Sequence, residues 1–551
     1  MSCLPHLQPP SWRALADACW VEVVAIVGGV SLAALGLWLD HHQHAAARGH
    51  SILPVLGGAG VSSAVIALLA RARGWDPQIP SFTQVGAGFR QRAGRLSAVL
   101  DPSRGLRLDF LIALVLVLVT AAFAYAASRS IPAAVFDTRT LSVWFESDLS
   151  DFMHAMTDRS REVGTNLHPW YFLGGFCFVQ ALVAIAGMTM LDAVHVFTAA
   201  QAGVWALVFY IVLRSICRYR LDAIVLSALG LTSAASVFWL AAPESFIGGS
   251  ISLLLAVLAI AVAQRKRLSE GVYVALNALT LGFTVTNWMG GIVATVLNQP
   301  PRRALQIIAN GFVIAVLLWM VAHIVFPSGD FLFAVTAKHT RYLYTTLNGG
   351  PLAVLGAFFF HGMVMPDLQL VDRFSPPVAN LPGNWPILVT QYSLPGSGTQ
   401  PWGILAVLTW AVLLVLGVWS LFRLRQHLRL RVGIALLVLG QLALHLVYGE
   451  ETFLYAMHYV PLLVLLVALV TWTRLRPVVL ALSALLASTT AINNSIQFDR
   501  ATSVVACLEQ HDTRDRLQRA ARTPIDKQAL LHLCTPPLRA APGRSSHRVD
   551  G

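Results

Sequence analysis

Long apolar runs recur along most of this 551-residue chain, and they constrain its fold more than any other feature. About 20 apolar residues in a helix cross the ~30 Å hydrocarbon layer of a membrane, inside which every backbone polar group needs a partner within the protein. Only 12% of the residues are charged, whereas soluble domains have about 25%. The sequence therefore predicts an all-α, polytopic transmembrane helical bundle instead of a large soluble helical protein.

About thirteen segments have the length and hydropathy of a span. They are Val23–Leu39, Ile52–Ala70, Phe110–Ala127, Ala193–Leu213, Ala223–Ala242, Ile247–Ala263, Val272–Trp288, Met289–Leu297, Ala304–Phe326, Trp402–Phe422, Val432–Tyr448, Phe453–Trp472 and Val478–Ile492. The short Met289–Leu297 segment suits a half-helix buried inside the bundle. The first span resembles a signal-peptide core, but the second follows so soon that an uncleaved anchor is favoured.

Positive charge assigns the loops to the two sides of the membrane. If the apolar run Tyr171–Met190 lies along the outer surface instead of crossing the membrane, nearly all Lys and Arg residues of the later loops fall on one side. Loops rich in Lys and Arg lie on the cytoplasmic side of membrane proteins. We therefore expect an interfacial helix in the first large external loop. The basic linker Arg71–Arg107 is then cytoplasmic and the insert 128–168 external. The net charge of +12 thus signals topology and not nucleic-acid binding.

The same arrangement places the tail after Ile492 outside, although the tail is itself basic. Cys507 and Cys534 lie in this tail, where an oxidising compartment would permit a disulfide; two unpaired thiols are the alternative. The expected organisation is two N-terminal spans and a linker in 1–106, a transmembrane core in 107–492 and a periplasmic tail in 493–551.

The polar insert between Leu141 and Tyr171 is the strongest indication of chemistry. It contains Glu146, Asp148 and Asp151 and ends in His168-Pro169. Four further segments bring polar side chains to the same predicted side: Pro243-Glu244-Ser245, Thr286-Asn287-Trp288, the loop from Pro327 to Pro401 with Lys338 and Arg341, and Gly449-Glu450-Glu451-Thr452 leading to His458. Their convergence predicts one external site for a substrate with lipid and polar parts.

The order of these parts resembles the C-type glycosyltransferase (GT-C) superfamily, whose members include protein O-mannosyltransferases and aminoarabinose transferases. Phe145-Glu146-Ser147-Asp148 is similar to the acidic motif of the first external loop in that superfamily. His168-Pro169-Trp170-Tyr171 resembles the corner that opens an interfacial helix, and Leu213-Arg214 resembles the end of the following span. The resemblance covers roughly residues 107–492 and lies in the order of the parts.

Two later features extend the resemblance, and two positions depart from it. The Pro243-Glu244-Ser245 turn resembles the outer end of a later span, and Tyr455, His458 and Pro461 resemble a late motif. The usual Asp-Glu pair is here Glu-Ser-Asp, and Trp170 replaces the second proline of the usual His-Pro-Pro corner. The first departure leaves the identity of the key acid open.

The resemblance implies a glycosyltransferase in the bacterial inner membrane with a periplasmic active face. It would transfer a hexose or pentose from a polyprenyl-phosphate carrier to a glycan, lipid or protein acceptor, with inversion. Such a reaction needs a carboxylate that accepts the proton of the incoming hydroxyl. Asp148 is the expected base because it matches the second acid of the motif. Glu146 and Asp151 are the alternates, and the competing role of Asp148 is to cap or solvate a loop helix.

Five other residues are expected to bind substrate. Lys338 or Arg341, with His458 behind them, would stabilise the leaving phosphate; snorkelling at the interface is the alternative role of these cations. His168 orients the interfacial helix or contacts phosphate, and Glu244 lines the cavity.

No strong metal-ligand spacing is present, so no metal site is predicted, although a divalent cation between acids stays open. The histidines at 41, 42, 44 and 50 are interpreted as a solvated loop, because Asp40 is the one acid beside them.

Two other classes of function stay open, and a non-catalytic assembly protein is the remaining possibility. A transporter or flippase for a lipid-linked solute should have internal repeats and polar residues on broken helices in mid-membrane. No repeat is visible in the sequence, and its polar groups collect at one face. A polysaccharide polymerase or ligase would depend on Arg and His in a large late loop, which 327–401 supplies.

Overall fold

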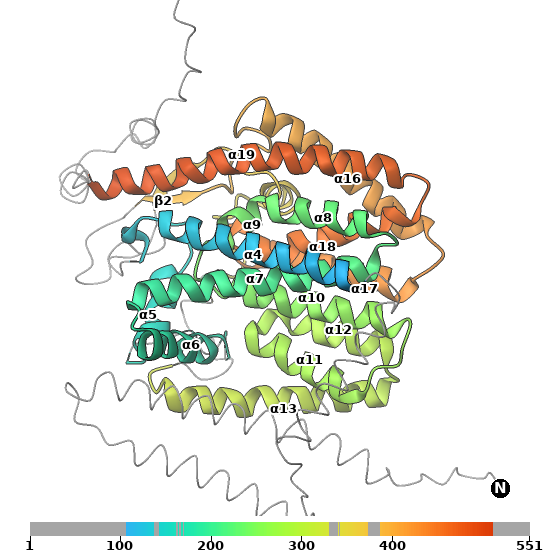
Figure 1. Ribbon diagram of the computed structural model, residues 1–551, viewed down its shortest axis with the longest axis horizontal. Coiled ribbons are helices and arrows are strands. Elements are labelled where there is room, and N and C mark those ends of the chain that lie inside the picture. The colour runs from blue at the N-terminus through green and yellow to red at the C-terminus, as the bar shows by residue number, and fades with distance from the viewer. Residues whose placement is uncertain are drawn as a thin grey trace, which may run out of the picture.

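The computed structural model describes residues 106–136, 143–160, 164, 167–168, 170–329, 340, 342–372 and 386–510. Figure 1 shows a bundle of long helices, with α5 (Leu149–Thr157), α6 (Tyr171–Ala186) and β2 (Pro386–Val389) together at its left end. The two predicted N-terminal spans lie outside the described residues.

Eight described helical segments are long and apolar enough to cross a membrane, and each coincides with a predicted span. They are α4 (Leu106–Ser130), α7 (Met190–Ile216), α10 (Phe246–Ala263), α13 (Pro301–Val325), α16 (Trp402–Arg423), α17 (Leu428–Val447), α18 (Ala456–Ala468) with its flanking 3-10 turns η5 (Thr452–Tyr455) and η6 (Leu469–Trp472), and α19 (Arg476–Gln510). The protein therefore has the fold of a helical membrane protein. The last helix continues past Ile492, where the final span was expected to end.

Three other predicted spans are built differently, so a count of thirteen is not confirmed. Ala223–Ala242 is broken at Ser233 into α8 (Arg220–Thr232) and α9 (Ala234–Trp239). Ser233 caps the second helix by accepting a hydrogen bond from the main-chain N–H of Ser236 at 3.2 Å. The free N–H groups at the start of α9 are satisfied from a distant loop, because Ala235 donates to the carbonyl of Gly362 at 2.8 Å.

The other two form a hairpin of short helices. α11 (Glu270–Phe283) is followed by the 3-10 turn η3 (Val285–Asn287). The next helix, α12 (Trp288–Asn298), turns back and packs against α11. The prediction of a short helix at Met289–Leu297 is thus confirmed. Each helix is too short by itself to cross about 30 Å of hydrocarbon at 1.5 Å per residue.

The loop from Pro327 to Pro401 carries structure that the all-α prediction did not include. It contains α15 (Pro351–Gly356), the π-helical turn η4 (Ala357–His361) and β1 (Gln369–Asp372), which pairs antiparallel with β2. The N–H of Leu388 in β2 also donates to the carbonyl of Val143 at 3.0 Å. The polar insert is therefore attached to the loop from Pro327 to Pro401 by a main-chain hydrogen bond.

α6 has 16 residues and is shorter than any of the eight candidate spans. It packs against α5 and α7 at the left end of the bundle in Figure 1. Its place beside the insert agrees with the predicted order of parts, and its position at a membrane surface stays a prediction.

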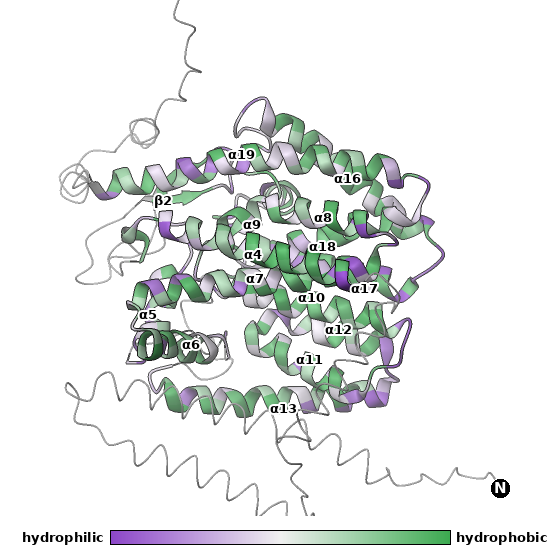
Figure 2. Cartoon of the chain, viewed as in Figure 1, coloured by the Kyte–Doolittle hydropathy of each residue, from purple (hydrophilic) through white to green (hydrophobic). Residues whose placement is uncertain are grey.

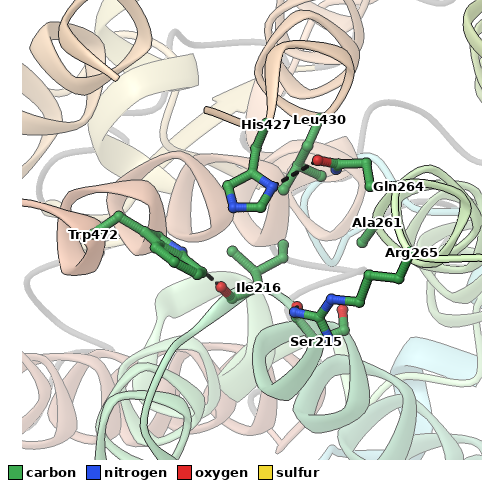
Figure 3. A pocket seen from close by; sticks show the side chains of 8 residues that line it. All are labelled: Ser215, Ile216, Ala261, Gln264, Arg265, His427, Leu430 and Trp472. Atoms are coloured by element: carbon green, nitrogen blue, oxygen red, sulfur yellow. Dashed lines mark hydrogen bonds between the residues drawn. The ribbon is translucent and has the colours of Figure 1, made fainter. Parts of the chain in front are cut away.

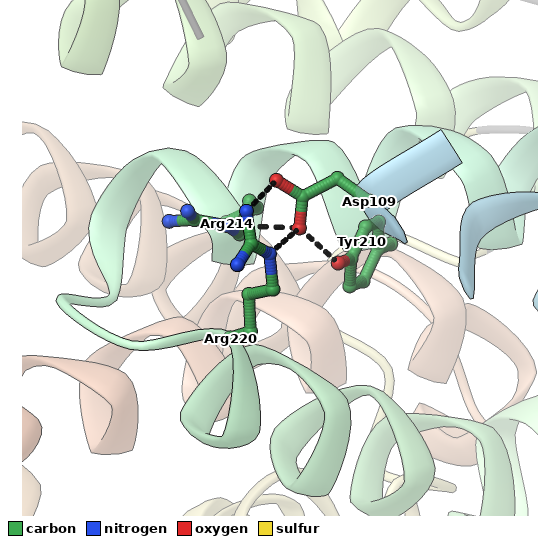
Figure 4. Close-up of polar contacts among 4 residues, drawn as sticks. All are labelled: Asp109, Tyr210, Arg214 and Arg220. Carbon is green, nitrogen blue, oxygen red and sulfur yellow. Dashed lines mark hydrogen bonds and ion pairs between the residues drawn. The ribbon is translucent and has the colours of Figure 1, made fainter. Parts of the chain in front are cut away.

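Ion pairs join the helices at the opposite end of the bundle. In Figure 4, Asp109 of α4 accepts hydrogen bonds from Arg220 at 2.7 Å, from Arg214 at 3.3 Å and from Tyr210 at 3.1 Å. Asp222 of α8 pairs with Arg476 of α19 at 2.7 Å. Figure 2 shows hydrophilic colour concentrated in the turns at this right-hand end. This is the end that charge assigns to the cytoplasm.

A disulfide lies toward the other end. Cys507, near the C-terminus of α19, is disulfide-bonded, and its partner lies outside the described residues. The described cysteines Cys177 and Cys217 are buried thiols outside any disulfide, and both pack within hydrophobic clusters. The predicted partner Cys534 is not among the described residues.

Candidate functional site

The start of the insert is anchored in the core of the bundle. Trp144 and Phe145 are fully buried, and their rings pack against Phe238 at centroid distances of 5.9 and 5.5 Å. Phe145 and Glu146 both have left-handed backbones, with φ of 50° and 60°. Two consecutive non-glycine residues rarely adopt this conformation, and such strain is found mainly where the surrounding structure enforces it at functional sites. This turn delivers Asp148 to the start of α5.

Asp148 and Glu244 are joined through the main chain. The N–H of Asp148 donates to Oε1 of Glu244 at 3.1 Å, and the N–H of Ser245 donates to Oε2 at 3.1 Å. Asp148 occupies the N-cap of α5 without a side-chain cap hydrogen bond, and it is half-buried. Its carboxylate is therefore not used as the helix cap that was the competing role.

Glu244 is only 1% exposed, and its pKa is raised well above the usual range. Burial is the main cause, the charge of Asp148 adds to it, and the two main-chain N–H donors oppose it. A smaller contribution comes from Asp151 in the first turn of α5. A carboxyl group that is buried beside a second acid favours its protonated form, as the acid of an acid–base site does.

His168 is held by the end of α11. The N–H of Trp170 donates a hydrogen bond to the carbonyl of Gly282 at 2.9 Å. The Trp170 ring packs directly on Gly282, where a Cβ atom added to the glycine would lie only 2.3 Å from the ring. Nδ1 of His168 lies 2.9 Å from the carbonyl oxygen of Phe283. A carbonyl only accepts, so Nδ1 carries the proton in the neutral ring.

The imidazole of His168 is therefore an acceptor at its other nitrogen. Burial lowers the pKa of His168 to about 4, against the opposing effects of the Phe283 carbonyl and the charge of Asp148. Nε2 lies 3.5 Å from the hydroxyl of Ser245, next to Glu244. The His-Pro corner and the Pro-Glu-Ser turn thus meet at one point.

Tyr171 of α6 secures this turn from the other side. Its hydroxyl donates to the carbonyl of Glu244 at 2.9 Å and accepts from Nε2 of Gln201 at 3.2 Å. The interaction connects α6 and α7 to the start of α10. The acid-bearing turn is consequently held from both sides.

A buried polar cluster continues from the acids toward the middle of the bundle. A Cβ added at Gly249 would lie 2.5 Å from Nε2 of His458, 2.9 Å from Nδ2 of Asn287 and 3.0 Å from Oγ1 of Thr284. Gln441 of α17 donates to Oδ1 of Asn287 at 3.1 Å. Nε2 of His458 and Nδ2 of Asn287 are buried without a hydrogen-bond partner among the described residues.

The structure gathers most of the predicted site residues at one end of the bundle. Asp148, Asp151 and His168 lie around Glu244, and His458 lies deeper, against Phe246 at a centroid distance of 5.7 Å. Glu146 lies close enough to Tyr392 to act on it: burial of Tyr392 is the main cause that raises the pKa of its hydroxyl, and the charge of Glu146 adds to it. Lys338 and Arg341 lie outside the described residues. Sequence reasoning missed Thr284 and Gln441, whose only signal was a polar side chain within an apolar run.

No cluster of three His, Cys, Asp or Glu side chains arranged to hold a metal ion occurs in the described part of the chain. The histidines between 41 and 50 lie outside that part. The arrangement of charged and neutral groups around Glu244 suits proton transfer and binding of hydroxyl groups. Comparison with protein-family models, with curated proteins and with solved structures found no match.

Proposed function

We propose that this protein is an integral-membrane glycosyltransferase that moves a monosaccharide from a polyprenyl-phosphate carrier to an acceptor hydroxyl. The observation that carries the proposal is the bonding of the Asp148 main chain to the buried Glu244 carboxyl. It joins the acidic insert to the Pro-Glu-Ser turn, which His168 of the His-Pro corner also approaches through Ser245, in agreement with the parts expected from the GT-C resemblance. The acceptor is a glycan, lipid or protein hydroxyl.

The reaction is a single displacement at the anomeric carbon. The acceptor oxygen forms a bond to that carbon, the bond from carbon to the phosphate oxygen breaks, and the lipid phosphate leaves with the electron pair. The hydroxyl proton passes to the carboxylate of Asp148, and the configuration inverts. Glu244 positions Asp148, and Lys338, Arg341 and His458 are the groups proposed to stabilise the departing phosphate.

The disulfide supports a periplasmic site. Phe498 of α19 packs against Trp144 of the insert at a centroid distance of 5.8 Å, and Cys507 lies further along the same helix. Disulfides persist in oxidising compartments such as the bacterial periplasm. The same orientation places the arginine-rich end in the cytoplasm of a bacterial inner membrane.

The decisive experiment compares Asp148→Asn with wild type in two assays: complementation of a deletion strain with glycan analysis of its envelope, and transfer by the purified protein from a polyprenyl-phosphate sugar. Removing the base should lower transfer about a hundredfold or more while the unfolding temperature stays similar. Asp158→Asn is the matched control, because Asp158 lies at the other end of α5, where its carboxylate accepts a hydrogen bond from the main-chain N–H of Ser160 at 2.9 Å. Full activity of both Asp148→Asn and Glu146→Gln would exclude the catalytic assignment.

A transporter for a lipid-linked solute is the second candidate, favoured by two interrupted helices. The chain breaks at Ser233 between α8 and α9 and at η3 between α11 and α12, and Asn287 of η3 is fully buried with an unpartnered amide nitrogen. Proteoliposomes separate the two functions. A transporter moves the intact lipid-linked sugar across the bilayer without an acceptor, whereas the proposed enzyme releases polyprenyl phosphate only when an acceptor is present.

A further inference from the structure

Glu451 is a buried carboxyl group immediately before η5, and it accepts hydrogen bonds from two segments of the chain. Oε2 accepts from the main-chain N–H groups of Thr390 at 2.8 Å and of Gln391 at 3.1 Å. Oε1 accepts from the hydroxyl of Thr390 at 2.7 Å and from the N–H of Phe453 at 3.3 Å. Glu451 is 1% exposed, and all of these donors are uncharged. Its two oxygens therefore connect the residues after β2 to the first turn of η5.

Links between distant elements at the arginine-rich end use fewer atoms. In Figure 3, the indole N–H of Trp472 donates to the carbonyl of Ile216 at 2.8 Å, and Nδ1 of His427 lies 2.7 Å from Oε1 of Gln264. Each of these contacts joins one donor to one acceptor. Glu451 instead presents both carboxylate oxygens to four donors. A glutamine amide has one oxygen and a second donor group, so the position requires a carboxylate.

Gln391 strengthens the same connection. Its Oε1 accepts from the N–H of Thr452 in η5 at 2.9 Å, and its Nε2 donates to the carbonyl of Asn348 at 2.9 Å. Thr390 and Gln391 are both buried. The residues after β2 are thus bonded to η5 through Glu451 and through Gln391, in a place where an unpaired donor is costly.

The two connected segments both contact the strained turn of the insert. On one side, the N–H of Leu388 in β2 donates to the carbonyl of Val143 at 3.0 Å. On the other side, the ring of Phe453 in η5 packs edge-on against Phe145 at a centroid distance of 5.3 Å. A left-handed backbone at consecutive non-glycine residues persists only where its neighbours enforce it. The segments that Glu451 joins are two of these neighbours.

We propose that Glu451 is a positioning residue, which fixes the strained turn and thereby the place of Asp148 at the start of α5. The inference rests on the proposed transferase, in which Asp148 is the base. Glu451 acts through β2 and Phe453 and does not touch the substrate. Its loss would loosen the turn from two sides, and a small displacement of a catalytic group lowers the rate steeply.

The test measures main-chain hydrogen exchange and transfer with the full-length protein in nanodiscs. Glu451→Gln should speed amide exchange about tenfold in residues 143–148 and 390–391, because the segments that hold them separate more often. In the same preparation kcat should fall about tenfold while KM changes less than about twofold, since the base moves and the groups that bind the substrate stay in place.

Glu450→Gln is the matched control, because Glu450 is the adjacent acid and takes no part in these hydrogen bonds. Thr390→Val removes only the hydroxyl donor to Glu451, so it should produce the same changes at a smaller size. Thr390→Ser keeps the hydroxyl and should behave like the wild type. This pair carries the test if Glu451→Gln does not fold.

The exchange measurement separates this inference from the proposed function. Faster exchange in residues 143–148 of Glu451→Gln, in a protein whose wild type transfers no sugar, would support the hold on the turn and exclude the transferase. Equal exchange and equal kcat in Glu451→Gln and Glu450→Gln would overturn the inference. A lower unfolding temperature of Glu451→Gln with unchanged kcat would also overturn it, because Glu451 would then stabilise the fold without positioning Asp148.

Discussion

Asp222 and Glu244 are two buried carboxyl groups at opposite ends of the α8–α9 segment, and they are compensated in different ways. Asp222 is fully buried and accepts hydrogen bonds from Nε and a terminal nitrogen of Arg476 at 2.9 and 2.7 Å. Glu244 is equally buried, but among the described residues its two oxygens accept only from the main-chain N–H groups of Asp148 and Ser245. Both groups lose water, and within the described part of the chain only Asp222 meets a countercharge.

This difference distinguishes an acid that holds two helices together from an acid that can exchange a proton. A buried carboxylate paired with a guanidinium joins two helices, because the charged hydrogen bonds of the pair offset the desolvation of the acid. Main-chain N–H groups carry no net charge, so a carboxyl group bound only by them can take up a proton when a second acid lies nearby. The end of the bundle that holds Asp222 is therefore arranged for cohesion, and the proposed transferase would use the end that holds Glu244 for proton transfer.

The largest expected effect tests the structural side of this comparison. Asp222→Asn should clearly lower the free energy of unfolding, because an amide in this fully buried position cannot replace the charged hydrogen bonds that Asp222 accepts from Arg476. Thermal and denaturant unfolding in detergent measure the change. Glu270→Gln is the control: its pair with Arg303 has side chains 43% and 42% exposed and should contribute less than about 1 kcal/mol. Equal losses of unfolding free energy in the two variants would show that the buried Asp222 pair stabilises the protein no more than an exposed pair does.

The next effect is on catalysis at the outer end. Glu244→Gln retains one acceptor for the main chain and loses the other, so Asp148 should shift while the fold loses only about 1 kcal/mol. Transfer should fall about a hundredfold, mainly in kcat, since small displacements of a catalytic group are costly. Ser245→Ala is the control, because it keeps both N–H donors to Glu244. A large loss of stability with unchanged kcat would make Glu244 a structural acid like Asp222.

A third test concerns the polar cluster beneath the acids. Gly249→Ala should destabilise the protein by about 1–3 kcal/mol, because its Cβ would overlap Nε2 of His458 and Nδ2 of Asn287, which have little room to move. Gly174→Ala in α6 is the control: its Cβ would meet nothing within 4 Å, and alanine favours a helix. If the two variants unfold alike, the cluster around Gly249 is looser than the distances indicate.

Hydropathy was sufficient to predict the eight long helices, because their apolar character is a property of local composition. The meeting of the insert with the Pro-Glu-Ser turn was predicted from charge, because counting spans between them places both segments at the same end of the bundle. The break at Ser233 was not predictable. It depends on the carbonyl of Gly362, more than 120 residues away, which accepts from the N–H of Ala235. The strand pair β1–β2 likewise depends on partners distant in the chain.

The candidate site shows the same division between local and distant information. Its acids and His168 stand out in the sequence as polar residues between apolar runs. Thr284 and Gln441 are single polar residues inside such runs, and nothing local indicates that they join Asn287 and His458 in one buried cluster. Contacts between distant helices determine that grouping.

The smallest effect sharpens the comparison through pH. The pKa of His168 is lowered to about 4 in the folded protein and is about 6.5 when unfolded, so the unfolded state binds the proton first as pH falls. Stability from this group is complete above pH 6.5 and is lost progressively as pH falls toward 4. Glu244 acts in the opposite direction, because its raised pKa lets the folded state hold a proton that the unfolded state releases. Between pH 7 and 5.5 the wild-type protein should lose about 1 kcal/mol of unfolding free energy through His168, and His168→Gln should not show this loss. Parallel pH profiles of wild type and His168→Gln would show that the imidazole is not held neutral beside Glu244.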